Sequence, residues 1–280
     1  MSLLYSVVLE LTAQTPATIP ATMGHQAHAL FLDLVGQVDP DLAARLHNEP
    51  GYRPFTVSPL SGGRFEGDTL ALRTGQSCRL RFTLLDGGPL WQTLTRHFLE
   101  TPALSLRLGN ARFRLERLLS TPKSDPTGWA AFTDWASLAA RPPRATFRLN
   151  FVSPTAFSRN EGNEKRFLLF PQPVDVWASF RRSWNLYAPD ALKLEEATWL
   201  ELQKFIEQRV LVTDYELQTA TLRFPKYLQK GFTGYCAYKI SGAEAGLSPQ
   251  AAQLAALADF SLYCGTGYKT TMGLGQTRPA

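Results

Sequence analysis

The chain has 280 residues, of which 44% are hydrophobic and 19% charged, a composition typical of globular proteins and not of disordered ones. No stretch reaches the roughly 20 apolar residues of a membrane-spanning helix, and the N-terminus lacks a basic leader, so we expect a cytoplasmic protein without membrane association. The net charge of +5, with 21 arginines and 8 lysines, weakly indicates a nucleic-acid partner, although a GC-rich genome explains the arginine excess equally well.

Alternating apolar and polar residues in the first half predict half-buried strands over 5–11, 78–84 and 112–116. Apolar residues at helical spacing predict helices over 24–36 and 90–100. Between the first helix and the second strand, Asp39-Pro40 provides a capping carboxylate and a first-turn proline for a shorter helix. This helix should end near Pro50-Gly51.

The second half repeats this layout of strands and helices. The same patterns predict strands over 145–152, 210–222, 232–240 and 270–276. They predict helices over 174–186 and 195–208, and a third that is capped by Ser248-Pro249 and stops at Gly265.

Read coarsely, each half follows the order β-α-β-β-α-β, with three of the four strands of the first half marked by alternation. The sequence predicts an α+β protein of two tandem ferredoxin-like (RRM-like) domains with antiparallel sheets. Residues 120–144 are rich in proline and small residues and form a plausible connector. We place the domains at 1–122 and 143–280. A ferredoxin-like sheet is a common RNA platform, although a fold alone does not define a function.

The three cysteines, Cys78, Cys236 and Cys264, are widely separated in the sequence. An odd number without close pairs argues against a disulfide framework and against a zinc site. We therefore expect reduced cysteines in or near the core, and neither a metal nor a cofactor.

A glycine-rich segment near the C-terminus is the most specific motif. It contains Gly265, Gly267, Gly273 and Gly275, with Lys269 between them. A P-loop and a dinucleotide fingerprint are excluded, because no Gly-Lys-Ser/Thr tripeptide occurs and no helix follows the glycines. A helix cap and a tight turn would explain Gly265 and could extend to Gly267, but they would not explain Gly273 and Gly275. For the whole segment we favour an RNA-backbone cradle whose amides face phosphate.

The sequence resembles a known family, the CRISPR-associated repeat-processing endoribonucleases (the "Cas-six" family). The matching stretches occur in order along nearly the whole chain: GHQAHALFLDLV, LHNEPGYRPFTVSPL, FVSPTAFSR with FPQPVDVWASFRRSWN, and LYCGTGYKTTMGLGQ. The resemblance implies two ferredoxin-like domains, which agrees with the predicted layout. It also implies cleavage of CRISPR repeat RNA in precursor crRNA without metal. In that reaction the 2′-hydroxyl attacks the adjacent phosphorus, leaving 2′,3′-cyclic phosphate and 5′-hydroxyl ends.

Such a reaction needs an acid, a base and a cation, and histidine is the natural acid or base near neutral pH. His47 lies at the C-terminal end of the short helix, where the helix dipole favours positive charge, and where the family places its catalytic histidine. Tyr52 could orient the substrate. Arg53 or Arg45 could stabilise the phosphorane, because the lysine often found near the family's histidine is missing here.

His28, on the first long helix, is a second catalytic candidate, because some family members use a histidine from this helix. A packed, hydrogen-bonded histidine is the alternative. His25 ranks lower, and His97 is expected to be structural. Which histidine would act as base and which as acid stays open.

Candidate RNA-binding residues are Arg181 and Arg182 on a predicted helix, Lys269 and the four glycines of the tail, and the basic, loop-like segment 158–166. A solvated helix face is the alternative for the two arginines. Two rival functions remain. One is a non-catalytic RNA-binding scaffold subunit of a CRISPR ribonucleoprotein, and the other is a ferredoxin-like protein that binds a small anion or another protein. Membership of a larger effector complex, and a monomeric or homodimeric state, are left open.

Overall fold

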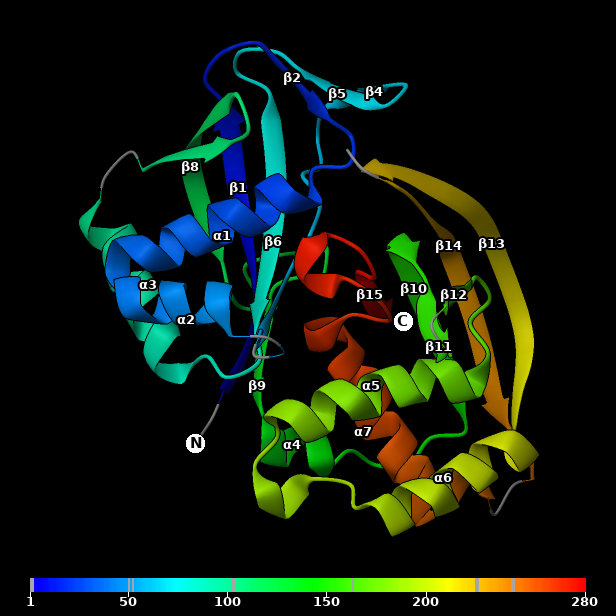
Figure 1. Cartoon of the computed structure of the whole chain (residues 1–280). Helices are drawn as coiled ribbons and strands as arrows, with labels where there is room; N and C mark the ends of the chain where they lie inside the picture. The colour runs from blue at the N-terminus through cyan, green and yellow to red at the C-terminus, as the bar shows by residue number, and fades with distance from the viewer. Residues whose placement is uncertain are drawn as a thin grey trace. The chain divides into compact units, whose positions relative to one another are not determined.

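The computed structural model describes residues 3–49, 51, 53–101, 104–162, 164–224, 227–242 and 245–280. The chain forms two compact units (Figure 1). The first comprises Met1–Phe132 with Arg223–Tyr227 and Thr271–Gly273, and the second comprises Thr133–Leu222, Leu228–Thr270 and Leu274–Ala280. No helix within the described ranges is both long and apolar enough to cross a bilayer.

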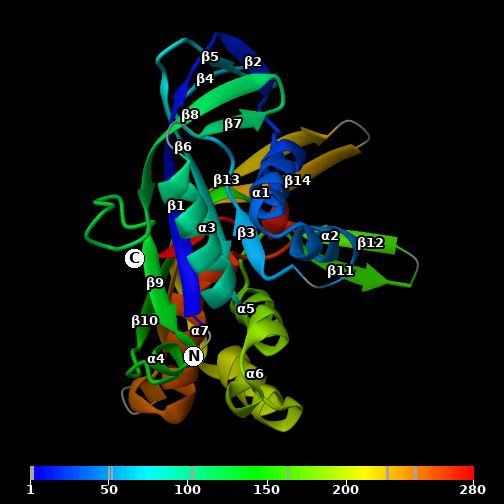
Figure 2. The ribbon, with the colours of Figure 1, turned by 90° about the vertical axis from the view of Figure 1, so that its left-hand side faces the viewer.

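The first unit is built on an antiparallel sheet with the strand order β3-β6-β1-β8-β7, and β9 also pairs with β1. Helices α1 and α3 cover one face of this sheet (Figure 2), and a separate small sheet has the order β2-β5-β4. The strands are β1 (Leu3–Ala13), β2 (Ala17–Pro20), β3 (Phe55–Val57), β4 (Arg64–Glu66), β5 (Thr69–Leu72), β6 (Ser77–Leu84), β7 (Ser105–Leu108), β8 (Ala111–Leu119) and β9 (Ala131–Asp134). The helices are α1 (Gly24–Val38), α2 (Pro40–Asn48) and α3 (Gly88–Glu100).

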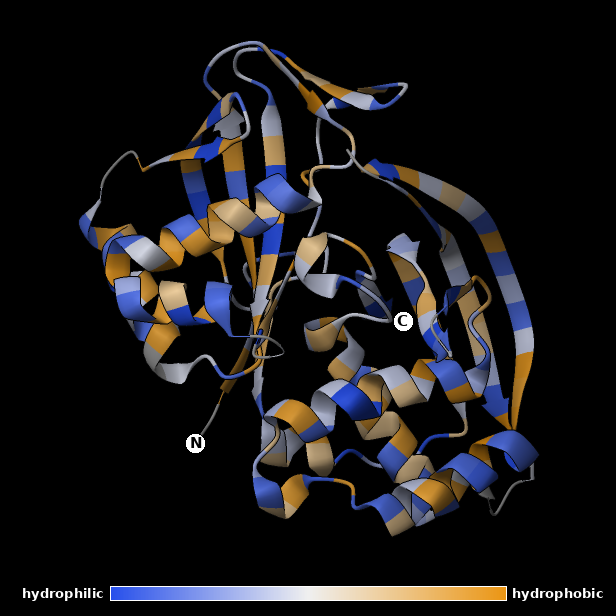
Figure 3. Ribbon diagram, in the orientation of Figure 1, coloured by the Kyte–Doolittle hydropathy of each residue, from blue (hydrophilic) through white to orange (hydrophobic). Residues whose placement is uncertain are grey.

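The second unit has a four-stranded sheet in the order β13-β14-β10-β15 and a separate two-stranded hairpin, β11-β12. Hydrophilic and hydrophobic residues alternate along β13 (Figure 3). The strands are β10 (Thr146–Thr155), β11 (Phe157–Glu161), β12 (Glu164–Leu168), β13 (Val210–Phe224), β14 (Tyr227–Ile240) and β15 (Thr277–Pro279). The helices are α4 (Trp135–Ala139), α5 (Pro173–Tyr187), α6 (Glu196–Arg209) and α7 (Pro249–Cys264), with short 3-10 turns η1 (Asp190–Leu192), η2 (Ala245–Leu247) and η3 (Thr270–Met272).

Both units confirm the predicted ferredoxin-like fold. In each, the first of the four principal strands lies between the third and the fourth, and the second strand is at the edge beside the third. Two local predictions are wrong. The last strand is β15 and not 270–276, because residues 270–272 form η3, and Gly273 and Gly275 have φ values of 82° and 67°, outside the β region. The segment 158–166 is expected to be loop-like, but residues 158–161 and 164–166 belong to strands β11 and β12.

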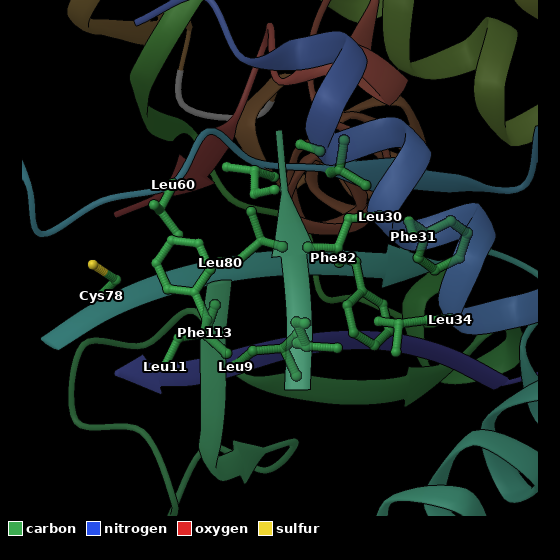
Figure 4. Close-up of a cluster of buried hydrophobic side chains, with 14 of the residues drawn as sticks. Leu9, Leu11, Leu30, Phe31, Leu34, Leu60, Cys78, Leu80, Phe82 and Phe113 are labelled. Atoms are coloured by element: carbon green, nitrogen blue, oxygen red, sulfur yellow. The ribbon is translucent and has the colours of Figure 1, made fainter. Parts of the chain in front are cut away.

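The core of the first unit lies between α1 and the sheet (Figure 4). Leu9 and Leu11 alternate on β1, so both point to the same face of the sheet, where Phe82 of β6 joins them. Phe31 of α1 stacks on Phe55 of β3, with ring centroids 4.3 Å apart. Cys78 is buried with the core, and its burial raises the pKa of the thiol to about 11, so this cysteine is an apolar packing residue.

The segment that follows β8 covers part of the opposite face of this sheet. Trp129 and Ala130 pack against Val8 and Leu119. The buried guanidinium of Arg81 lies 4.8 Å from the centre of the Trp129 ring. Residues of the proline-rich stretch thus form part of the first unit, which extends to residue 132.

Asp125 organises this covering segment. Its fully buried carboxylate accepts hydrogen bonds from the amides of Thr127, Trp129 and Ala130, each at 3.0 Å. Arg79 lies 3.6 Å from the same carboxylate. Burial acts to raise the pKa of Asp125, but these hydrogen bonds outweigh it and leave the pKa below its ordinary value. The folded state therefore favours the charged carboxylate.

We expect Asp125→Asn to lower the free energy of unfolding by about 2–4 kcal/mol, because either orientation of the amide sets N–H donors against backbone N–H donors. Urea unfolding at neutral pH measures the change. Asp33→Asn is the control, since Asp33 is exposed and its carboxylate accepts a hydrogen bond from Gln37 of the same helix. Equal, small effects of both substitutions would contradict the organising role of Asp125.

Candidate functional site

The first unit contains a close approach between the glycine-rich segment and the start of α1. A Cβ atom added at Gly24 would lie 2.0 Å from the carbonyl oxygen of Met272. One turn further along α1, Nδ1 of His28 lies 3.0 Å from the carbonyl oxygen of Thr271. Residues four apart share a helix face, so Gly24 makes room for the backbone that His28 then contacts.

The contact with Thr271 fixes the tautomer of His28. A carbonyl oxygen accepts hydrogen bonds and does not donate them, so Nδ1 carries the proton and Nε2 of the neutral ring carries the lone pair. Burial is the main cause of a lowered pKa for His28; the bond to Thr271 opposes it, and the positive charges of Arg53 and His47 lower the pKa further. His28 is thus a neutral imidazole at neutral pH with an accepting Nε2.

Arg53 and His47 are therefore both within electrostatic range of the His28 ring. His47 is exposed in the last turn of α2, a helix capped by Asp39, whose carboxylate accepts from the amide of Leu42 at 2.9 Å. Arg53 is half-buried just before β3. Three of the predicted catalytic residues thus gather in one unit, and the fourth, Tyr52, lies outside the described residues.

The other candidates of the first unit have different surroundings. Arg45 of α2 forms an exposed ion pair at 3.2 Å with Glu49, the residue that follows the helix. His25 is exposed, and its ring meets the edge of Phe224 at 5.6 Å. His97 contacts Gln37 through Nε2 at 3.0 Å, an arrangement that fits the structural role expected from the sequence.

Two glycines of α1 provide a matched test of the approach at Gly24. Alanine in a helix normally adds about 0.5–1 kcal/mol of stability over glycine. At Gly36 the nearest atom to an added Cβ is 3.5 Å away, so Gly36→Ala should stabilise by about that amount. At Gly24 the added atom would meet the Met272 carbonyl at 2.0 Å, so Gly24→Ala should lower both the unfolding midpoint and any activity that depends on His28. Equal stabilisation by both variants would disprove the close approach.

The glycine segment uses its amides inside the protein. The amide of Gly265 donates to the carbonyl of Ser261 at 2.9 Å, that of Gly267 to Oγ of Ser179 at 2.7 Å, and that of Gly275 to the carbonyl of Pro154 at 3.1 Å. The expectation that these amides are open donors for phosphate is therefore wrong at three of the four glycines.

Glycine is required in this segment because the φ values are positive and, at Gly267 and Gly275, because there is no space for a Cβ atom. Gly267 has a φ of 79°, and an added Cβ would lie 2.4 Å from the carbonyl oxygen of Ala156. At Gly275, with a φ of 67°, it would lie 2.0 Å from the carbonyl oxygen of Thr266. Gly273 is buried, with Pro59 at 3.4 Å from an added Cβ. The glycines therefore shape the turn that presents the half-buried residues Tyr268 and Lys269.

The two candidate arginines of α5 differ sharply. Arg181 is paired with Glu196 at 2.7 Å and lies over the ring of Trp199 at 5.5 Å, so its guanidinium joins α5 to α6. Arg182 is exposed, three residues after Ser179, whose hydroxyl holds the glycine segment. Of the two, Arg182 is therefore the one with an exposed side chain.

Sequence patterns missed the residues that hold the glycine segment. Ser179 is 88 residues from Gly267, and Thr271 is 243 residues from His28. Such contacts leave no local periodicity, and a serine on a helix face or a threonine carbonyl carries no signal of its own. Within the described residues no cluster of three or more His, Cys, Asp or Glu side chains has the arrangement of a metal site.

Comparison with known proteins identifies the family. The profile of the CRISPR Cas6 N-terminal domain matches residues 3–140, and that of CRISPR-associated endoribonuclease Cas6 matches residues 149–277. Curated proteins named CRISPR-associated endoribonuclease Cas6 match from Streptococcus thermophilus, 25% identical over 46% of this chain and 48% of the relative, and from Mycobacterium tuberculosis, 26% identical over 50% and 40%. The match therefore spans half or less of the length of these curated relatives.

Solved structures cover the chain completely. A Cas6 (TTHB231) product complex is 29% identical with a TM-score of 0.81 over 100% of both chains. Thermus thermophilus Cas6 (TTHB231) is 28% identical with a TM-score of 0.74 over 100% of this chain and 99% of the other. A histidine-to-alanine mutant of Cas6 (TTHA0078) is 26% identical with a TM-score of 0.71 over 100% of both chains. The chain belongs to the Cas6 family of CRISPR-associated endoribonucleases.

Proposed function

We propose that this protein is an endoribonuclease that processes precursor crRNA by cutting CRISPR repeat RNA. One observation carries the proposal. Nε2 of His28 is an acceptor, and both His47 and Arg53 lie within electrostatic range of the same ring. Family membership supports an endoribonuclease, and two of the similar structures are Cas6 product complexes. No membrane partner is proposed.

The proposed chemistry uses the protein's own groups. Nε2 of His28 takes the proton of a 2′-hydroxyl, and the resulting oxygen attacks the adjacent phosphorus. His47, exposed at a helix end, gives a proton to the departing 5′-oxygen. Arg53 faces the charge that builds up on the phosphorane. One P–O bond forms and one breaks, leaving 2′,3′-cyclic phosphate and 5′-hydroxyl ends, and the reaction requires no metal.

We also propose a division of labour between the two ferredoxin-like domains, taken as residues 1–122 and 143–280. The first carries the catalytic side chains. The second holds the RNA through Lys269 and Arg182. The four glycines of the tail shape the turn that carries Lys269. Arg181 supports Arg182 by joining α5 to α6. Tyr52, beside Arg53, stays a candidate for orienting the substrate.

The test is incubation of end-labelled repeat RNA from the same genome with the protein in excess chelator. One discrete cut, with a cyclic phosphate on the 5′ fragment, supports the proposal. Salt-sensitive binding without cleavage would favour the scaffold function, because phosphate contacts release counterions but make no cut. Absence of RNA binding even at low salt would exclude both and favour a protein or small-anion ligand.

A further inference from the structure

Two aromatic rings from distant parts of the sequence lie together on the second unit. Phe167 of β12 and Tyr268 of the glycine segment have ring centroids 5.5 Å apart and planes inclined by 51°. Phe167 is 36% exposed and Tyr268 is half-buried. A single exposed apolar residue needs no explanation, but two adjacent rings with cations around them form a surface with its own chemistry.

Lysines surround these rings. Nζ of Lys165 lies 3.9 Å from the centre of the Tyr268 ring and 5.8 Å from that of Phe167. Nζ of Lys269 lies 5.2 Å from the Tyr268 ring. Lys165 and Phe167 are alternate residues of β12 and so share one face of the hairpin. The surface thus combines two aromatic rings with two ammonium groups.

The backbone beneath Tyr268 is held in place. Its amide donates to the carbonyl of Ala156 at 2.9 Å, and the preceding amide, of Gly267, donates to Oγ of Ser179 at 2.7 Å. Arg159 of the hairpin is paired with Asp175 of α5 at 2.6 Å. Asp175, Ser179 and Arg182 follow helical spacing, so the hairpin and the glycine segment are tied to one face of α5.

We propose that Tyr268 and Phe167 form a stacking platform for one unpaired nucleobase of the bound RNA, with Lys165 and Lys269 contacting the phosphates beside it. The inference rests on the proposed function and adds a contact that holds a single-stranded nucleotide. An unpaired base offers a free π-face, whereas a base inside a helix is already stacked.

Magnitudes favour the base over the resident lysine. A cation over an exposed ring contributes about 2- to 5-fold to an equilibrium constant, whereas a base stacked on an aromatic side chain contributes about 5- to 150-fold. The displaced ammonium of Lys165 keeps a partner, because the phosphate next to the base takes the place of the ring. An acidic peptide would use the lysines alone and leave the rings without a role.

The experiment scans 2-aminopurine through the unpaired positions of a repeat RNA that carries a 2′-deoxy nucleotide at the mapped cut. Stacking on an aromatic ring quenches this fluorophore. We expect one position to be quenched by the wild-type protein and by Tyr268→Phe but not by Tyr268→Leu, with Tyr268→Leu binding about 5- to 150-fold more weakly. Tyr215→Leu is the matched control, because Tyr215 is 56% exposed on β13 of the same unit.

The lysines are tested by the salt dependence of binding. Lys165→Gln should reduce the slope of log affinity against log salt by about 0.7, the value for one phosphate contact on a single strand. Lys204→Gln, at an exposed position of α6, should leave the slope unchanged.

The outcomes separate this inference from the proposed function. The platform is overturned if the wild-type protein cleaves the RNA but quenches no position. It is also overturned if Tyr268→Leu and Tyr215→Leu lose affinity equally. Either result leaves the proposed endoribonuclease function standing. Failure of the wild-type protein to bind any RNA overturns both, as does binding of polyglutamate in place of RNA. The quenching measured with the wild-type protein decides the question even if Tyr268→Leu proves unstable.

Discussion

His47→Ala should lower the single-turnover rate constant for repeat cleavage by about 10²–10⁴-fold, the range of a lost general acid or base, while RNA affinity changes little. The reason is geometric. His47 is exposed in the last turn of α2, so its removal leaves no cavity, and the proposed reaction loses its proton donor. The rate is measured with excess protein over labelled RNA, and affinity by filter binding under the same conditions.

His25→Ala is the matched control for this variant. His25 is also exposed and also contributes positive charge near His28, but the proposed reaction gives it no proton to transfer. A near-normal rate in His25→Ala beside a large loss in His47→Ala would assign the loss to proton transfer. Full activity in His47→Ala would remove His47 from the mechanism.

His28 should govern the acidic limb of the pH–rate profile. Its folded-state pKa lies below the ordinary 6.5, chiefly through burial, so the base stays neutral at pH 7 and the rate falls only as pH drops through that lowered value. The same sign holds for stability. The folded state prefers the neutral ring, so stability is present above pH 6.5 and declines as acid forces the ring to charge.

Two substitutions separate the proton-transfer role of His28 from its contact with Thr271. His28→Gln keeps an N–H donor for the Thr271 carbonyl but removes the titrating nitrogen, whereas His28→Ala removes both. We expect a rate loss of about 10²–10⁴-fold in both variants, with a lower unfolding midpoint in the alanine variant. If the glutamine variant kept the wild-type rate and the acidic limb of the pH–rate profile, His28 would serve only to hold the Thr271 carbonyl and not to transfer a proton.

The long elements were predictable because each carries its own periodic signal. Helix α7 has a sequence signal at each end, Ser248 before it and Gly265 after it. In the structure Oγ of Ser248 accepts from the amide of Ala251 at 3.2 Å, and Gly265 has a φ of 67°. Short strands such as β4 and β9 have three or four residues each, too few for a period to show. The bounds of the last strand were not predictable, because residues 270–272 form η3 and Gly273 and Gly275 have positive φ values before β15 begins.

The candidate site was predictable in its residue types but not in its contacts. The position of His47 after a capped helix was visible in the sequence, whereas the neutral tautomer of His28 depends on the carbonyl of Thr271, distant in the chain. Arg181 and Arg182 are adjacent and chemically identical, and only the packing of α6 separates the paired one from the exposed one. Contacts between residues far apart in the chain decide which of two adjacent arginines is paired, and the pattern of a single sequence does not reveal those contacts.

The inclusion of Thr271–Gly273 in the first unit has a consequence for the order of events during translation. The chain is made from the N-terminus, and N-terminal domains generally fold first. The carbonyl that sets the tautomer of His28, however, is 243 residues downstream of it. A nascent chain that displays α1, α2 and β3 therefore has its histidines in place but lacks the group that prepares one of them. A chain stopped before residue 271 would therefore contain His28 but lack the contact that fixes its tautomer.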